Sequence, residues 1–211
     1  MSSSIRVVCF DLGGVLIQIC RSWREGCAVA DLPVRDGIDA ALDHASEWRI
    51  ANEQYQIGAI TLADYARTVS DSIDGLYTPA EIERIHLCWT RDPYADVNDV
   101  IDDLHRADIT TAALSNTNEA HWAIIAHVDP VARLNHAFAS HLMELHKPDP
   151  AIFRAFESAI GHAGDEILFF EDTEENAIAA NREFGWHTHV VDPLQPTAPQ
   201  IRAALGEFGV L

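Results

Sequence analysis

Residues 5–16 (IRVVCFDLGGVL) constrain the fold of this chain more than any other stretch. The apolar run at residues 7–10 predicts a short buried strand, which ends where Asp11 is followed by Gly13 and Gly14. In open α/β sheets ligands bind at the carboxyl ends of the strands, so a carboxylate in this place is a candidate catalytic group. Asp-x-Gly-Gly is also common turn chemistry, and this stretch alone favours neither interpretation.

The sequence between residues 21 and 89 shows only helical periodicities. The predicted helices span residues 22–29, 35–44, 47–56, 62–73 and 79–89. Thr61 and Thr78 are predicted N-caps, because each precedes a helical pattern with a side-chain oxygen that can accept a backbone N–H bond. No convincing strand interrupts these helices, so the stretch is predicted to be an all-helical insertion.

From residue 94 onwards helices alternate with short apolar strands, which is typical of βαβ units and a parallel sheet. The predicted strands lie at residues 110–114, 138–140, 166–170 and 187–191. We therefore predict an α/β fold with a Rossmann-like parallel sheet sandwiched by helices. Residues 1–16 and 93–211 would form this core domain, and residues 17–92 a second, helical domain inserted after the first strand.

Composition excludes some partners. The 211 residues include 14 Lys and Arg against 33 Asp and Glu, and the net charge of -19 would repel a nucleic-acid backbone or an anionic membrane surface. No run approaches the roughly 18 apolar residues of a membrane span, and the amino terminus lacks the pattern of a signal peptide. We therefore expect a cytoplasmic protein without nucleic-acid or membrane partners. The sequence does not indicate an oligomeric state.

Polar groups follow the predicted strands in order along the chain. They are Asp11, then Ser115 with Asn116, then Lys147 in the following loop, then Glu171 with Asp172. If the strands are parallel, all four groups face one crevice. Carboxylates gathered there would need a cation, and hard oxygen ligands with open positions suit Mg²⁺.

These residue types match the needs of phosphoryl transfer. Asp11 could attack phosphorus and form an acyl-phosphate, which splits one difficult displacement into two easier ones. Mg²⁺, the Lys147 ammonium, the Ser115 hydroxyl and amide groups of the following helix would spread the charge of the transferring group. Taken singly, each motif is better explained as a helix cap or a solvated charge. Four of them in the right order favour a function.

The motifs FDLGGVL, LSNT, HKPDP and FFEDTEENA resemble those of the haloacid dehalogenase-like (HAD) superfamily of phosphohydrolases, and residues 17–92 resemble its helical C1-type cap. The resemblance implies Asp11 as nucleophile and a small phosphorylated metabolite, such as a sugar phosphate, as substrate. It also implies that Ser115, Asn116 and Lys147 bind the phosphoryl group. The implied Mg²⁺ ligands are Asp11, the backbone carbonyl of Gly13, Glu171 and Asp172. The stretches SNTNEAHW and YQIGAIT are similar to the branch of α-D-glucose-1-phosphate phosphatases and the N-terminal phosphatase domain of epoxide hydrolases.

One position departs from the superfamily pattern. Gly13 stands where most of its phosphatases carry an Asp that serves as general acid, and loss of such a group typically costs about 10²–10⁴ in rate. Slow turnover, or turnover restricted to good leaving groups, is therefore one hypothesis, and His146 or a cap residue is a possible substitute acid. A 2-haloacid dehalogenase, whose leaving halide needs no acid, is an alternative. A weakly active or non-catalytic relative that binds a phosphorylated ligand is another.

Substrate specificity is expected from the helical insertion, because the core motifs handle only the phosphoryl group. Five side chains are candidates by position alone, and each is equally well explained as a helix-surface or packing residue. They are Arg21, Arg24, Trp48, Asn52 and Gln56.

Overall fold

The first strand of the chain lies at the centre of a parallel sheet. The computed structural model describes residues 5–211. Within them five strands run in the order β5-β4-β1-β6-β7, and every neighbouring pair is parallel. Their bounds are Val7–Phe10 (β1), Thr110–Ser115 (β4), His136–Ala139 (β5), Ile167–Glu171 (β6) and His187–Val190 (β7). The predicted α/β fold is confirmed.

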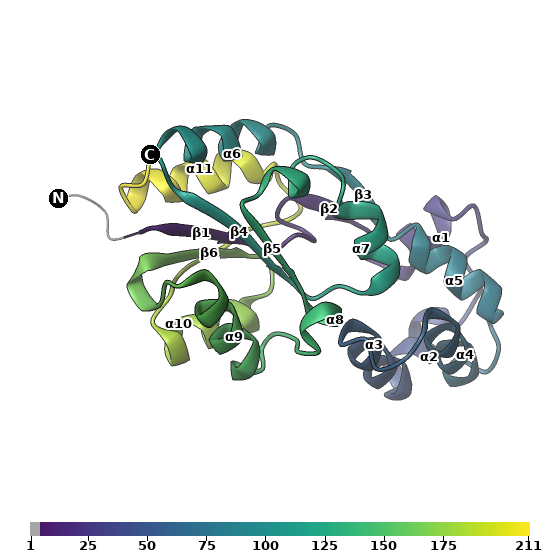
Figure 1. Cartoon of the computed structure of the whole chain (residues 1–211). Helices are drawn as coiled ribbons and strands as arrows, with labels where there is room; N and C mark the ends of the chain where they lie inside the picture. The colour runs from purple at the N-terminus through teal and green to yellow at the C-terminus, as the bar shows by residue number, and fades with distance from the viewer. Residues whose placement is uncertain (1–4) are drawn as a thin grey trace.

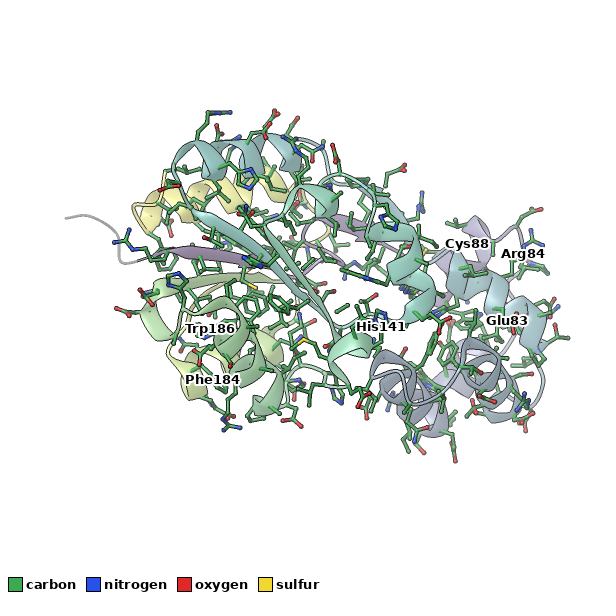
Figure 2. The ribbon with its side chains drawn as sticks, viewed as in Figure 1. Glu83, Arg84, Cys88, His141, Phe184 and Trp186 are labelled. Atoms are coloured by element: carbon green, nitrogen blue, oxygen red, sulfur yellow. The ribbon has the colours of Figure 1, made fainter. Side chains whose placement is uncertain are left out.

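Helices cover both faces of this sheet (Figure 1). On one face lie α6 (Val97–Arg106) and α11 (Thr197–Glu207), and on the other α9 (Pro150–Ile160) and α10 (Glu174–Phe184). Val8 and Phe10 of β1 pack on the first pair of helices, whereas Val7 and Cys9 pack on the second. Trp186, labelled in Figure 2, fills the second interface. Burial on both faces explains why β1 is apolar at every position.

Five of the helices between β1 and β4 form a separate lobe, residues 23–89, which we call the helical lobe (Figure 1). They are α1 (Trp23–Val29), α2 (Ile38–His44), α3 (Glu47–Gln56), α4 (Leu62–Ser72) and α5 (Pro79–Leu87). The lobe has its own hydrophobic cluster, with Tyr55, Tyr77 and Ile85 at most 1% exposed. Thr61 and Thr78 begin α4 and α5 with complete capping boxes, so both predicted N-caps are confirmed.

A two-stranded ribbon that the sequence did not predict joins the helical lobe to the core. β2 (Ile17–Ile19) and β3 (Thr90–Pro93) pair antiparallel at the two ends of the lobe. The Cys20 N–H extends the pairing by donating to the Trp89 carbonyl at 2.9 Å. IQI and TRDP are too short and too mixed in polarity to indicate strands on their own.

The remaining short elements lie where the core meets the helical lobe or on loops of the core. They are α7 (Glu119–Ile125), α8 (Ser140–Met143) and two 3₁₀ turns, Val131–Arg133 and Gly164–Glu166. His141 of α8, labelled in Figure 2, marks the junction, where its carbonyl oxygen would lie 3.0 Å from a Cβ at Gly58. None of the helices within residues 5–211 is long and apolar enough to cross a membrane.

Two contacts fix the helical lobe against the core. The Ser140 hydroxyl accepts the Thr117 N–H at 2.9 Å and lies 2.6 Å from the carbonyl oxygen of Gln56 in α3. His121 Nε2 donates to the carbonyl of His86 in α5 at 2.7 Å, and the two imidazole rings stack with centroids 4.1 Å apart. The loop that follows β4 is therefore tied to the lobe above it.

Candidate active site

The carboxyl ends of three adjacent strands supply most of the predicted site residues. Asp11 follows β1 directly, Ser115 ends β4, and Glu171 ends β6 with Asp172 next to it. Because β1 lies between β4 and β6 and all three are parallel, these groups meet at one edge of the sheet. The structure thus brings together the groups that the sequence placed on separate strands.

Lys147, the only lysine in the sequence, lies completely buried among these groups. Its Nζ is 2.6 Å from Glu171 Oε2 and 3.2 Å from Asp11 Oδ1. The Asn116 amide holds the backbone of this residue, since Nδ2 donates to the Lys147 carbonyl and Oδ1 accepts the Lys147 N–H, each at 2.8 Å. Asn116 therefore positions Lys147, and its role in binding a substrate directly stays a prediction.

Glu171 is fully buried and its carboxylate accepts three hydrogen bonds. Oε1 accepts the N–H groups of Asp172 and Thr173, each at 3.1 Å, while Oε2 accepts from Lys147. Asp11 and Asp172 line the adjacent cavity, whereas Glu171 does not. Glu171 thus lies behind the cavity wall, where it anchors both the ammonium and the start of the next loop.

Charge in this site is unbalanced towards carboxylates. Burial lowers the pKa of Lys147, but the charges of Asp11 and Glu171 more than offset this and raise it above its usual value. Burial and the neighbouring carboxylates raise the pKa of Glu171. One ammonium therefore faces more negative charge than it can neutralise, a situation that a bound cation would relieve.

The three acidic side chains are close enough to share one cation. Asp11, Glu171 and Asp172 each place a carboxylate oxygen within 4.8 Å of the others. Gly14 makes the close approach possible, because it has a φ of +84° and a Cβ there would lie 2.4 Å from Asp172 Oδ2. The donor set consists of hard oxygens, which fits Mg²⁺. Gly13 lines the same cavity, and its carbonyl as a ligand stays a prediction.

Arg21 reaches this cluster from the segment before α1. Its Nη1 donates to Asp172 Oδ2 at 2.6 Å, and the side chain is 26% exposed. The guanidinium thus already pairs with one of the acidic groups. The sequence indicated Arg21 only as a candidate for specificity.

A cavity of about 710 Å³ lies between the sheet edge and the helical lobe. Trp48, Asn52 and Gln56, three of the candidates by position, line it from successive turns of α3. Arg24 does not line it, because this side chain pairs with Asp39 at the surface.

Sequence reasoning missed most of the aromatic side chains in the cavity. The ring-bearing residues that line it from the helical lobe are Trp23, Trp48, Tyr65, His86 and Trp89, which we call the aromatic wall. They come from α1, α3, α4 and the end of α5, and only the packing of those helices brings them together. The sequence carries a weak signal for them, since three of its five tryptophans belong to this wall.

Comparison with known proteins identifies the family. The family model of haloacid dehalogenase-like hydrolases matches residues 5–183. The chain belongs to the haloacid dehalogenase-like hydrolases. It is therefore an enzyme of the hydrolase class, as the resemblance implied. The narrower branch of glucose-1-phosphate phosphatases and epoxide hydrolases stays a prediction. No curated protein matches the chain.

Solved structures of other HAD proteins have the same fold. A HAD-like hydrolase from Porphyromonas gingivalis is 26% identical with a TM-score of 0.75, over 96% of this chain and 98% of that one. A HAD enzyme from Bacteroides thetaiotaomicron, in complex with magnesium and inorganic phosphate, is 22% identical with a TM-score of 0.73. The match covers 94% of this chain and 100% of that one. The L-2-haloacid dehalogenase of Xanthobacter autotrophicus is 18% identical with a TM-score of 0.64, over 96% and 83%.

Proposed function

We propose that this HAD hydrolase is a Mg²⁺-dependent phosphomonoester hydrolase that acts on a small phosphorylated metabolite. The observation that carries the proposal is the cluster of three carboxylates around one buried ammonium. A dianionic phosphoryl group cannot enter such a cluster without added positive charge, which Mg²⁺ would supply. The complex of a structural neighbour with magnesium and inorganic phosphate supports this choice of ion and ligand.

The residues of the site fit the successive steps of phosphoryl transfer. A carboxylate oxygen of Asp11 attacks phosphorus, the ester P–O bond breaks, and the electron pair leaves with the alcohol oxygen. Lys147 and Ser115 hold the phosphoryl oxygens, and Asp11, Asp172 and Glu171 would hold the metal. Water then hydrolyses the aspartyl-phosphate, releasing inorganic phosphate and restoring the Asp11 carboxylate.

We also propose that residues 17–92 act as a cap domain over a core of residues 1–16 and 93–211. The cavity lies between the sheet edge and the helical lobe, so a bound substrate would contact both. A wall of this kind keeps bulk water away from the aspartyl-phosphate during the first step.

Phosphate release tests the proposed function. The substrates are sugar phosphates, nucleotides, p-nitrophenyl phosphate and acetyl phosphate, each assayed with Mg²⁺ and with a chelator. We expect turnover that requires both Mg²⁺ and Asp11, and Asp11→Asn should lose activity by on the order of 10⁴ or more. Asp99→Asn, at an exposed position of α6, is the matched control and should retain activity. Activity that survives in Asp11→Asn would refute the proposal.

A 2-haloacid dehalogenase is the second candidate, because the wall beside Asp11 is apolar. A Cβ at Gly13 would lie 3.3 Å from Ile19 Cδ1, so isoleucine fills the space next to the nucleophile. Against it, a 2-haloacid carries a carboxylate, and the Lys and Arg side chains among the described cavity residues are both already paired with acids. Chloride release from 2-chloropropionate in the presence of a chelator would support this candidate over the phosphatase.

A further inference from the structure

The helical lobe lines the cavity with several flat rings and with the uncharged side chains of Asn52 and Gln56. The aromatic wall presents indole, phenol and imidazole rings, and aliphatic side chains of the helical lobe line the same cavity. These aliphatic residues are Leu42, Val69, Ile82 and Ile85. Aromatic rings pack best against other flat rings, in stacked or edge-to-face arrangements.

Charges in the cavity disfavour a second anionic group on the ligand. Lys147 is paired with Asp11 and Glu171, and Arg21 is paired with Asp172. Burial, together with the neighbouring His121, lowers the pKa of His86 to about 3, so this imidazole is neutral. Glu53 and Glu175 add carboxylates to the lining. A diphosphate or a phosphorylated acid would therefore meet repulsion outside the phosphoryl site.

The described residues that form the wall beside the nucleophile offer no group to protonate a leaving oxygen. They are Gly13, Ile17 and Ile19, and Ile19 lies against the position where a side chain at residue 13 would begin. His146, the substitute acid considered above, lines the same cavity, but its Nδ1 is engaged with the Lys147 carbonyl oxygen at 2.9 Å. Without an acid at this wall the departing oxygen must carry its negative charge alone. A phenolate does so easily, since the pKa of a phenol is about 10, as for Tyr. A simple alkoxide is about as basic as hydroxide and therefore far more basic than a phenolate.

From these three features we propose that the substrate is a phosphate monoester of a phenol-like hydroxyl on a planar, uncharged aromatic ring. This inference rests on the phosphatase function proposed above. In the first step an oxygen of Asp11 bonds to phosphorus, the bond between phosphorus and the aryl oxygen breaks, and the electron pair leaves as aryloxide. The aryloxide takes a proton from solvent. Water then attacks phosphorus, and the Asp11 carboxylate and inorganic phosphate are released.

A kinetic comparison tests the leaving group. Phenyl phosphate and benzyl phosphate carry the same ring, but the first releases a phenolate and the second an alkoxide. The value of kcat/KM reports the step in which this leaving group departs. We expect benzyl phosphate to react about 10²–10⁴-fold more slowly, the factor that a general acid typically contributes. Equal kcat/KM values would overturn the proposal, because they would show that another cavity group protonates the alkoxide.

A binding comparison tests the ring without any turnover. Phenylphosphonate carries a planar aromatic ring and cyclohexylphosphonate a puckered saturated ring with the same number of carbons. Calorimetry with Asp11→Asn and Mg²⁺ gives the Kd of each. We expect phenylphosphonate to bind roughly 2–10-fold more tightly, as aromatic contacts contribute in other proteins. Equal affinities would overturn the proposal.

Variants of α3 show whether the aromatic wall causes this preference. Trp48→Ala should remove it and Trp48→Phe should keep most of it. Ile50→Ala is the matched control, because Ile50 lies on the same helix, is 53% exposed and does not line the cavity. A preference that is unchanged in Trp48→Ala and also in Trp23→Ala would count against the aromatic wall and overturn the proposal.

Acetyl phosphate separates this proposal from the one on which it rests. Its leaving acetate needs no acid and is too small to reach the aromatic wall. Turnover that requires Asp11 and Mg²⁺, combined with equal rates for phenyl and benzyl phosphate, would overturn the aryl proposal and leave the phosphatase intact. No turnover of acetyl phosphate by the folded protein would overturn both.

Discussion

The two walls of the cavity are built in different ways. In the core wall, functional groups lie at strand ends or in the next loop and are held at their backbone, as the Asn116 side chain holds the backbone of Lys147. In the helical lobe, side chains from several helices converge, and Trp48 is held by a single hydrogen bond from Nε1 to the Leu42 carbonyl at 2.8 Å. The sheet edge thus positions the reactive groups, whereas the packing of the helices shapes the part of the cavity that would contact the rest of the substrate.

The two regions also differ in how they carry charge. The core buries Lys147 and Glu171 completely, with no exposed surface on either side chain. In the helical lobe the ion pairs reach solvent, and Arg24 and Asp39 are each 62% exposed. Because buried charges depend strongly on their partners and exposed ones do not, the same kind of substitution should have very different consequences in the two regions.

Loss of the buried Lys147 ammonium should lower the free energy of unfolding more than any other change considered below. Lys147→Met leaves Asp11 and Glu171 without the ammonium that pairs with both, and removing one member of a buried ion pair typically costs about 3–5 kcal/mol. Urea denaturation in the presence of a chelator measures the loss, and millimolar Mg²⁺ should recover part of it.

Arg106→Met is the control for that experiment, because Arg106 pairs with Asp103 at the surface and is 71% exposed. It should leave the free energy of unfolding nearly unchanged. Equal stabilities of Lys147→Met and the parent protein in chelator would contradict the picture of a core wall held together by charge.

A smaller loss of stability is expected from a substitution at the contact between the core and the helical lobe. Ser140→Ala removes the acceptor of the Thr117 N–H and the hydroxyl that reaches the Gln56 carbonyl. Leaving buried polar groups unpaired costs about 1–3 kcal/mol, and hydrogen exchange should quicken at Thr117 and near Gln56. Ser158→Ala on the exposed face of α9 is the control. Exchange that quickens equally throughout the chain would mean that the hydroxyl is not a joint between the regions.

The smallest effect concerns an ion pair within the helical lobe. Arg35 pairs with Glu81 at 2.5 Å, and this contact together with the Thr78 cap lowers the pKa of Glu81 to about 2 from the usual 4.5. Glu81→Gln retains the capping box and loses only the charge, so the melting temperature at pH 7 should fall by up to about 2–4 °C. The matched control is Arg24→Ala, which should not change the melting temperature measurably.

The pH dependence of that difference follows from the lowered pKa. A carboxyl group whose pKa is lower in the folded state stabilises the protein above its ordinary pKa, and the stabilisation is lost as the pH falls through the folded value. The gap in melting temperature between the parent protein and Glu81→Gln should therefore narrow from pH 5 to pH 2. A gap that stays constant over this range would argue against the ion pair.

The sequence predicted the elements that have strong local signals. Helix α3 lies at residues 47–56 as predicted, and Thr61 and Thr78 cap the next two helices because the N-cap pattern depends only on neighbouring residues. The ribbon of β2 and β3 was missed because its strands find their hydrogen-bond partners only through the fold. Local periodicity contains no information about such pairing.

In the site, too, some features could be predicted from the sequence and others depend on the packing of the fold. The meeting of Asp11, Ser115 and Glu171 was predicted from parallel strands alone, since the carboxyl ends of parallel strands lie at one edge of the sheet, and the structure shows that their strands are also neighbours. The aromatic wall could not be predicted, because no local pattern shows which faces of separate helices will face a common cavity. Trp48 and Arg24 were equal candidates by position, yet one lines the cavity and the other lies at the surface.

Because β2 and β3 pair antiparallel, the helical lobe takes the place of the loop in a β-hairpin. The chain leaves the core at Ile19 and returns at Thr90, directly across the ribbon. Paired strands lie about 5 Å apart, and the entropy of closing a loop grows only slowly with its length. Residues 20–89 could therefore be exchanged for another folded unit, or for a short turn, without altering the register of β1, β4 and β6. Grafting of this kind would give the same hydrolase core a different selectivity.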